Sequence, residues 1–195
     1  MSFGQEEGED VIRNTFEQYK TAILNDRGEE AFQYVDSRTH AYYNKMAEVS
    51  RQADSLAVDS MDLLDKMMVL TIRHRATKEE IQSFDGKRLL IFAIKNGMID
   101  KKSVGYQEIG AVSFEGKEMA TGQLRTLGQD TPVYFDFHKE EGNWKVDLTS
   151  VFAISGAAMK KMFEESGEDE NEMLDLILEM MTGTAPTSAI WHPIE

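Results

Sequence analysis

The predicted fold rests on one stretch of this 195-residue sequence, Val133-Tyr-Phe-Asp-Phe-His-Lys-Glu-Glu-Gly-Asn-Trp-Lys-Val-Asp147. Its first half alternates, with Phe135 and Phe137 on one side and polar residues between them, which is the pattern of a half-buried strand. Residues 139–142 have the composition of a tight turn, and the alternation resumes after them. The sequence therefore predicts an antiparallel hairpin with one apolar face.

Two more predicted strands precede this hairpin. Val104–Phe114 alternates in the same way, and after a glycine turn Glu118–Leu127 follows. A second turn at 128–130 leads to Pro132, which is expected to open the third strand because proline is tolerated at the first position of a strand. Four consecutive strands over 103–151 with short turns predict an antiparallel meander, and we expect helices to cover one of its faces.

Helical spacing of apolar residues predicts four helices before the sheet. No proline occurs before Pro132, which favours a helical first half. The four predicted helices cover residues 11–24, 29–35, 37–53 and about 60–75, with a break at Arg27-Gly28 after the first. Ser37 is the predicted N-cap of the third helix, and Asp59 or Ser60 that of the fourth.

The segment between these helices and the sheet contains one clear and one ambiguous pattern. Thr77-Lys-Glu-Glu80 matches a capping box, which predicts a short helix after it. Within residues 85–97, the apolar run Leu89–Ile94 suits either a buried strand or a helix. We favour the helix, because Asp85 is placed to cap its start and Gly97 suits the left-handed residue that ends many helices.

After the sheet, apolar spacing predicts two more helices, over 157–163 and 171–181. The predicted fold class is therefore α+β: a helical N-terminal half packed on a curved antiparallel sheet of four strands or slightly more, with extra C-terminal helices. We expect a single domain over 1–195. Its predicted parts are a helical core (11–53), a helical insertion (54–102), the sheet (103–151) and an acidic helical tail (152–195).

Composition and charge exclude several classes of protein. The chain has no cysteine, which excludes disulfides, thiol nucleophiles and iron–sulfur clusters. Its net charge is −14, and no basic face of the kind that binds phosphate is evident. No apolar run approaches the roughly 18 to 20 residues of a membrane span, and the acidic start lacks the features of a signal peptide. We therefore expect a cytoplasmic protein that binds neither nucleic acid nor membrane.

Two parts of the chain carry a family resemblance. One is a first helix that contains Tyr19, followed by a glycine break and the short helix over 29–35; the other is the hairpin ending Gly142-Asn-Trp-Lys-Val146. Together they resemble the nuclear transport factor 2-like, or cystatin-like cone, superfamily. Residues 54–102 and the tail after Val151 depart from that pattern. The resemblance implies a curved sheet wrapped round a helix to leave a conical cavity, a fold shared by isomerases, dehydratases, transport adaptors and binding modules.

The resemblance also supplies candidate catalytic residues. Tyr19 falls near the position of the oxyanion-stabilising tyrosine in isomerase-like members, whereas the stretch Asp36-Ser-Arg-Thr-His40 lacks the context of their base aspartate. Asp136, Asp147 and His138 on the hairpin are the other candidates. If the hairpin phenylalanines face the core, Asp136 and His138 face outward; a slip of one residue would turn them into the cavity.

No cofactor and no metal site are expected, because the four histidines have no ligand spacing and the glycine-rich phosphate motifs are absent. Methionines concentrate in the insertion and the tail, where they either fill the core or form a lid, partner or dimer surface. Our first hypothesis is a non-catalytic module that binds a small apolar ligand or a protein partner, with a homodimer left open. The alternative is an isomerase or dehydratase that uses Tyr19 with Asp136 or Asp147 in a polar cavity.

Overall fold

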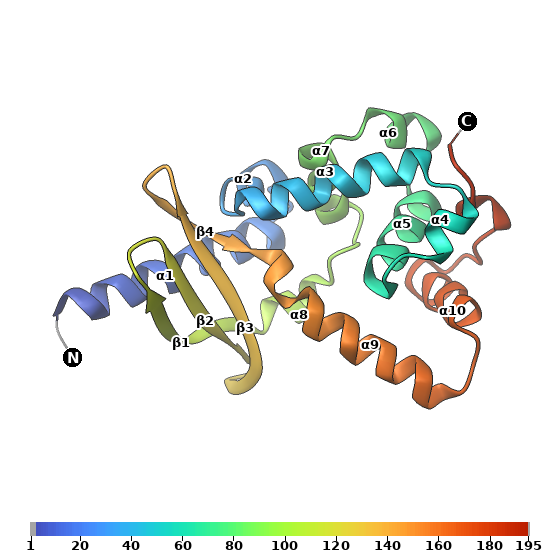
Figure 1. The fold of residues 1–195 in the computed structure, drawn as a ribbon. Coiled ribbons are helices and arrows are strands. Elements are labelled where there is room, and N and C mark those ends of the chain that lie inside the picture. The colour runs from blue at the N-terminus through green and yellow to red at the C-terminus, as the bar shows by residue number, and fades with distance from the viewer. Residues whose placement is uncertain (1–2, 195) are drawn as a thin grey trace. The chain divides into compact units, whose positions relative to one another are not determined.

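The structure is a computed structural model that describes residues 3–194. The described chain contains helices first, then one four-stranded antiparallel sheet in the order β1-β2-β3-β4, then further helices (Figure 1). The predicted α+β class and the meander are therefore confirmed.

The α-helices are α1 (Phe3–Leu24), α2 (Gly28–Gln33), α3 (Ser37–Gln52), α4 (Ser55–Asp59), α5 (Leu63–Arg75), α6 (Lys78–Ser83), α7 (Gly86–Lys95), α8 (Lys101–Gly105), α9 (Phe152–Ser166) and α10 (Glu170–Thr182). The strands are β1 (Gln107–Glu115), β2 (Met119–Thr126), β3 (Gln129–Glu140) and β4 (Asn143–Asp147).

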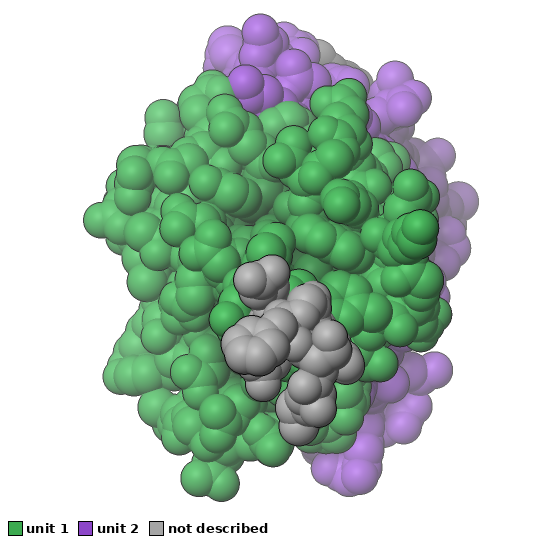
Figure 2. Space-filling model, turned by 90° about the vertical axis from the view of Figure 1, so that its left-hand side faces the viewer, with its two compact units in different colours: residues 1–42, 89–151 green, residues 43–88, 152–195 purple. Residues whose placement is uncertain are grey.

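The chain divides into two compact units, coloured separately in Figure 2. Unit 1 comprises residues 1–42 and 89–151, and unit 2 comprises residues 43–88 and 152–195. Each unit is thus built from two separate stretches of sequence. The expectation of a single domain stays a prediction.

Unit 1 is the sheet with α1 packed on it. In Figure 1 α1 runs across the sheet, and it contacts β1, β2 and β4. Its apolar stripe includes Ile12 and Phe16, both almost fully buried, and the ring of Phe16 lies 5.4 Å from that of Phe135 on β3. Phe137, two residues further along β3, is completely buried. The alternation in the hairpin therefore places its phenylalanines on the helix side of the sheet, as predicted.

Unit 2 is helical. Helix α5 contacts both α9 and α10, and Leu70, Ile72, Leu174 and Leu178 are fully buried. Arg73 of α5 is also buried, and its guanidinium donates hydrogen bonds to the carbonyl oxygens of Ser50 (2.9 Å) and Ala53 (2.6 Å) at the end of α3. These carbonyls have no partner within their own helix, so the arginine serves as a side-chain cap.

Several predicted boundaries are wrong for local reasons. Val104 lies in α8, because the Asp100 side chain accepts a hydrogen bond from Lys102 N and starts a helical turn. Asp36, and not Ser37, caps α3, since its Oδ1 accepts a hydrogen bond from Thr39 N at 2.9 Å.

Two further corrections concern α5 and β3. The predicted fourth helix (about 60–75) is present as α5, but it begins at Leu63, with Asp62 and not Asp59 or Ser60 at the N-cap position. The short helix α4 before it, which Asp54 caps through Ala57 N, was not predicted. Strand β3 begins at Gln129, before Pro132, because this proline falls where the pairing of β2 with β3 shifts register and no ladder hydrogen bond is required of it.

The ambiguous segment 85–97 is helical, as we favoured. Asp85 Oδ1 accepts a hydrogen bond from Arg88 N, and Gly97 has a φ of 68°. The capping box at Thr77 is also confirmed, with both reciprocal hydrogen bonds formed. None of the helices within residues 3–194 has the length and apolar character needed to cross a membrane.

Candidate functional site

Three ionisable side chains meet at one edge of the sheet in unit 1: Asp36, His138 and Asp147. Residues 34–36 run beside β4, because Val146 N donates to Tyr34 O (2.8 Å) and Asp36 N donates to Val146 O (3.0 Å). This short parallel pairing brings Asp36, at the start of α3, next to the end of the hairpin.

The hairpin register determines which side chains join Asp36. Asp136 pairs with Asp147 across the β3–β4 ladder, so both lie on the same face of the sheet. His138, two residues along β3, shares that face, and it is the face opposite to Phe135 and Phe137. The predicted outward placement of Asp136 and His138 is thus correct. This part of the outer face is nevertheless covered, because the side chain of His138 is only 13% exposed.

The Asp36–His138–Asp147 cluster is tightly held. His138 Nδ1 lies 3.1 Å from Asp36 Oδ2, and one ligand atom from each of the three residues falls within 4.8 Å of the others. Asp147 Oδ1 accepts hydrogen bonds from Thr149 N (2.8 Å) and Thr149 Oγ1 (2.6 Å). The side chain of Asp36 is fully buried, and Asp147 is 4% exposed. Neither carboxylate therefore has much freedom to move.

The electrostatics of the cluster are dominated by carboxylates. Burial raises the pKa of the neighbouring Asp136, and the negative charge of Asp147 raises it further, while His138 and Arg38 act in the opposite direction. Arg38 is the nearest fixed cation, with Nη1 at 3.1 Å from Asp36 Oδ2 and a side chain that is 54% exposed. His138 and Arg38 also line an open groove of about 930 Å³, whereas Asp36 and Asp147 are not among its lining residues.

Tyr19, the remaining predicted site residue, lies apart from this cluster. It is 6% exposed on α1, and its ring centroid is 6.2 Å from that of Phe16, which packs against the helix side of the sheet. Asp136 and Asp147 lie on the other side. The structure therefore brings together Asp136, Asp147 and His138 but not Tyr19.

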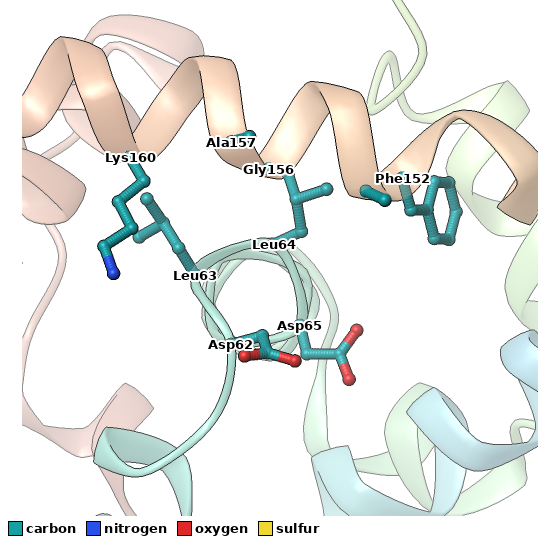
Figure 3. Close-up of a pocket in the computed structure, with 9 residues that line it drawn as sticks. Asp62, Leu63, Leu64, Asp65, Phe152, Gly156, Ala157 and Lys160 are labelled. Atoms are coloured by element: carbon teal, nitrogen blue, oxygen red, sulfur yellow. The ribbon is translucent and has the colours of Figure 1, made fainter.

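A pocket of about 370 Å³ lies in unit 2 between α5 and α9. Figure 3 shows Leu64 pointing toward α9 beside Gly156, with Lys160 lying over Leu63 on one side and the ring of Phe152 on the other. A Cβ atom on Gly156 would lie 3.4 Å from Leu64 Cδ1, so the two helices are in close contact at this point. The volume falls in the range of small-molecule sites, roughly 300–1,000 Å³.

The charged side chains around this pocket differ in whether they form an ion pair. Asp65 forms an ion pair with Lys45 at 2.8 Å. Lys160, on the opposite helix, has no ion pair or hydrogen bond with any residue of the described chain. The side chain of Asp62 makes no capping hydrogen bond to α5. The pocket thus combines an apolar wall with the ammonium group of Lys160 and the carboxylate of Asp62, neither of which forms an ion pair in the described chain.

Sequence reasoning named Asp36 only within the stretch 36–40, which lacks the context of the family's base aspartate, and it did not single out the pocket residues. The only local signal for Asp36 is its position three residues before Thr39, which suits an N-cap. Its meeting with His138 depends on the pairing of Val35 with Val146, more than a hundred positions apart in sequence. The pocket likewise joins residues 62–65 to residues 152–160, and no periodicity links such distant segments.

Comparison of the chain with protein-family models, with curated protein sequences and with solved structures finds no significant match. Inferences about function therefore rest on the geometry of the two sites described above.

Proposed function

We propose that the chain is a non-catalytic binding module with a cone-like fold of the nuclear transport factor 2-like kind, and that it holds a small amphipathic carboxylate in the α5–α9 pocket. The order of the elements supports the fold assignment: a long first helix is followed by short helices and then by a meander that wraps its apolar face onto α1. Binding of a protein partner and formation of a homodimer stay predictions.

The packing of unit 1 favours binding over catalysis. In the cone-like enzymes implied by the resemblance, the space between the sheet and its helix holds the substrate. Here the buried side chains of Ile12, Phe16, Tyr19 and Phe137 occupy that side of the sheet. The candidate acids Asp136 and Asp147 lie on the other face of the sheet, an arrangement that does not suit a shared proton transfer with Tyr19.

The observation that carries the proposal is the lining of the α5–α9 pocket. Leu63, Leu64, Phe152, Ala153 and Ala157 provide apolar surface, and Lys160 provides a positive charge with no partner in the described chain. A ligand with a short alkyl body and a carboxylate would bury its apolar part against these side chains and place its charge at the ammonium group. Because the carboxylates of Asp62 and Asp65 also line the pocket, the preference for acids over alcohols and amines depends on direct contact between the ligand's carboxylate and Lys160.

The test is a thermal-shift titration with three probes of equal chain length: octanoate, octanol and octylamine. Octanoate is expected to raise the melting temperature most, octanol less, and octylamine least, because only the carboxylate forms a charge-assisted contact with Lys160. In Lys160→Met, the advantage of octanoate over octanol should disappear. A wild-type protein that responds to none of the three probes would overturn the proposal.

Gly156 offers a matched pair of variants that separates pocket binding from surface adsorption. Leucine at this position would extend into the pocket and block it, whereas alanine adds only a methyl group at ordinary contact distance from Leu64. We expect Gly156→Leu to lose the octanoate response and Gly156→Ala to keep it. An equal response in both variants would place the bound probe elsewhere.

A further inference from the structure

We propose that Asp36, His138 and Asp147 form a binding site for a first-row divalent cation, with Zn²⁺ and Mn²⁺ as the best fits. This site is in unit 1 and does not depend on the function proposed for the α5–α9 pocket in unit 2.

The spacing of the three side chains fits a single ion. Their ligand atoms all lie within 4.8 Å of one another. An ion midway between two atoms at that limit would be about 2.4 Å from each, and small side-chain rotations would bring it to the roughly 2.0–2.2 Å of zinc bonds to histidine and carboxylate.

The nitrogen of His138 gives an independent indication of a ligand. Nδ1 is buried and makes no hydrogen bond within the described chain, although Asp36 Oδ2 is only 3.1 Å away. The two atoms are close, but the ring is not oriented to direct an N–H at that oxygen. Buried polar atoms are nearly always satisfied, and a cation bound to Nδ1 would supply its missing partner.

The charge balance supports a divalent ion. Asp36, Asp136 and Asp147 contribute three carboxylates to the region around His138, and Asp136 interacts electrostatically with Asp147, His138 and Arg38. Arg38 forms an ion pair with Asp36, and Lys145 lies opposite His138 in the β3–β4 ladder, on the same face of the sheet. With the three carboxylates ionised and both cations counted, the group still carries net negative charge, which a divalent cation would neutralise.

The surroundings of the ligands resemble the supporting shell of a metal site. Thr39 N holds Asp36, and the backbone and hydroxyl of Thr149 hold Asp147, so each carboxylate is oriented before an ion arrives. His138 lies on the wall of the open groove, which provides an entry path and room for water to complete the coordination.

The mixture of ligands decides which metal is bound. One imidazole nitrogen with two carboxylates suits Zn²⁺, Mn²⁺, Fe²⁺ or Co²⁺. Ca²⁺ and Mg²⁺ prefer shells made of oxygen alone, and Mg²⁺ keeps most of its water. The protein should therefore discriminate against both of these ions.

The direct test is isothermal titration of the full chain with ZnCl₂, together with the visible absorption of bound Co²⁺, which reports on the ligands around that ion. We expect one Zn²⁺ per chain and little heat with CaCl₂ or MgCl₂. His138→Phe keeps an aromatic ring but removes the nitrogen, and it should weaken Zn²⁺ binding at least about tenfold. His192→Gln, which removes an exposed histidine in the tail, is the control and should bind as the wild type does.

Substitution of Arg38 provides a second test, in which the expected result is tighter Zn²⁺ binding and none of the three proposed ligands is removed. Its guanidinium shares Asp36 Oδ2 with the proposed ion, so Arg38→Met removes a competing positive charge. We expect this variant to bind Zn²⁺ severalfold more tightly while its circular dichroism is unchanged.

Three results would overturn the proposal: no Zn²⁺ binding to the wild type, unchanged binding in a folded His138→Phe protein, or loss of binding in His192→Gln. Equal binding of Ca²⁺ and Zn²⁺ would contradict the assigned role of His138. A pocket that fails to bind octanoate would leave the cation site unaffected, so the two proposals fail separately.

Discussion

The Nζ atom of Lys66 lies 2.7 Å from Oε1 of Glu170, although the side chain of Lys66 is only 4% exposed. A second carboxylate, that of Asp59, lies 3.3 Å from the same nitrogen. Hydrogen bonds from Asn171 and then from Lys66 lower the pKa of Asp59. The two partner carboxylates, which belong to α10 and α4, thus stabilise a buried ammonium group on α5 within unit 2.

Removal of one partner of this ion pair should cost more than removal of the buried charge itself. Glu170→Gln leaves Lys66 with its weaker partner and should lower the free energy of unfolding by about 1–2 kcal/mol, less than for a fully buried pair because Glu170 is 44% exposed. Lys66→Met keeps the apolar stem and should stay within about 1 kcal/mol of the wild type. Urea denaturation gives both values. Glu172→Gln is the control, because it removes a negative charge from the same first turn of α10 and so measures the effect of the helix dipole alone. A larger loss of stability in Lys66→Met than in Glu170→Gln would contradict this account.

Arg73 should be among the most sensitive positions in unit 2. Besides Ser50 and Ala53, its guanidinium donates to the carbonyl oxygen of Ile190 at 3.1 Å, so it joins the end of α3 to the last 3₁₀ turn. Arg73→Met would leave these carbonyls without a donor and should destabilise the protein by about 3 kcal/mol. Arg73→Lys should recover only part of this loss, because an ammonium group lacks the planar fork of donors. Thermal unfolding measures both, and the exposed Arg88→Met is the control.

Asp175 should make the stability depend on pH. Burial raises its pKa, with His74 acting in the opposite direction, and its Oδ1 atom is buried with no hydrogen bond in the described chain. Because the folded-state pKa is above the unfolded value, the stabilisation from this group is present below the unfolded pKa of about 3.9 and is lost as the pH rises through the folded pKa.

Asp175→Asn should therefore raise the melting temperature at pH 7 by about 1–3 °C, and the gain should vanish near pH 3.5. Melting curves at the two pH values test this, with the exposed Glu179→Gln on the same helix as the control. A gain of equal size at both pH values would show that packing, and not protonation, is responsible.

Two glycines of the sheet should respond differently to alanine. A Cβ atom on Gly122 of β2 would lie 2.6 Å from Ile109 Cγ2 and 3.0 Å from Phe137 Cε2, both buried side chains. Gly122→Ala should therefore cost about 1–3 kcal/mol through overpacking. At Gly110 the nearest atom is Arg125 Cδ at 2.5 Å, on a flexible side chain that is 39% exposed. Gly110→Ala should cost less than about 1 kcal/mol. Chemical denaturation that ranks the two variants the other way would contradict this reading.

The features that local chemistry determines could be predicted from the sequence. The capping box at Thr77, the hairpin at residues 133–147 and the helix over 85–97 each depend on residues a few positions apart, and all three are present. The burial of Phe135 and Phe137 follows from strand alternation alone.

The predictions that were wrong or missing concern two kinds of feature. Some are helix starts where neighbouring residues could each serve as the N-cap, and the others are contacts between residues far apart in the sequence. Asp36 and Ser37 both suit an N-cap, and the parallel pairing at Val35 decides in favour of Asp36. The helix that starts after Asp54 was missed, and the start of α5 was placed at Asp59 or Ser60 instead of Asp62, because several residues that suit an N-cap lie close together here. Of the candidate site, sequence reasoning supplied Asp136, His138 and Asp147. It could not supply their contact with Asp36, which requires the assembled sheet edge.

The division of each unit between two stretches of sequence has a consequence for synthesis on the ribosome. Helix α1 is complete long before β1–β4 are translated, so Ile12 and Phe16 have no sheet to cover them until residue 147 has emerged. Residues 43–88 wait still longer, for the chain beyond residue 152. During translation the apolar faces of these helices therefore stay uncovered until the later stretch of the same unit has emerged, and the contacts that close each unit join residues far apart in the sequence.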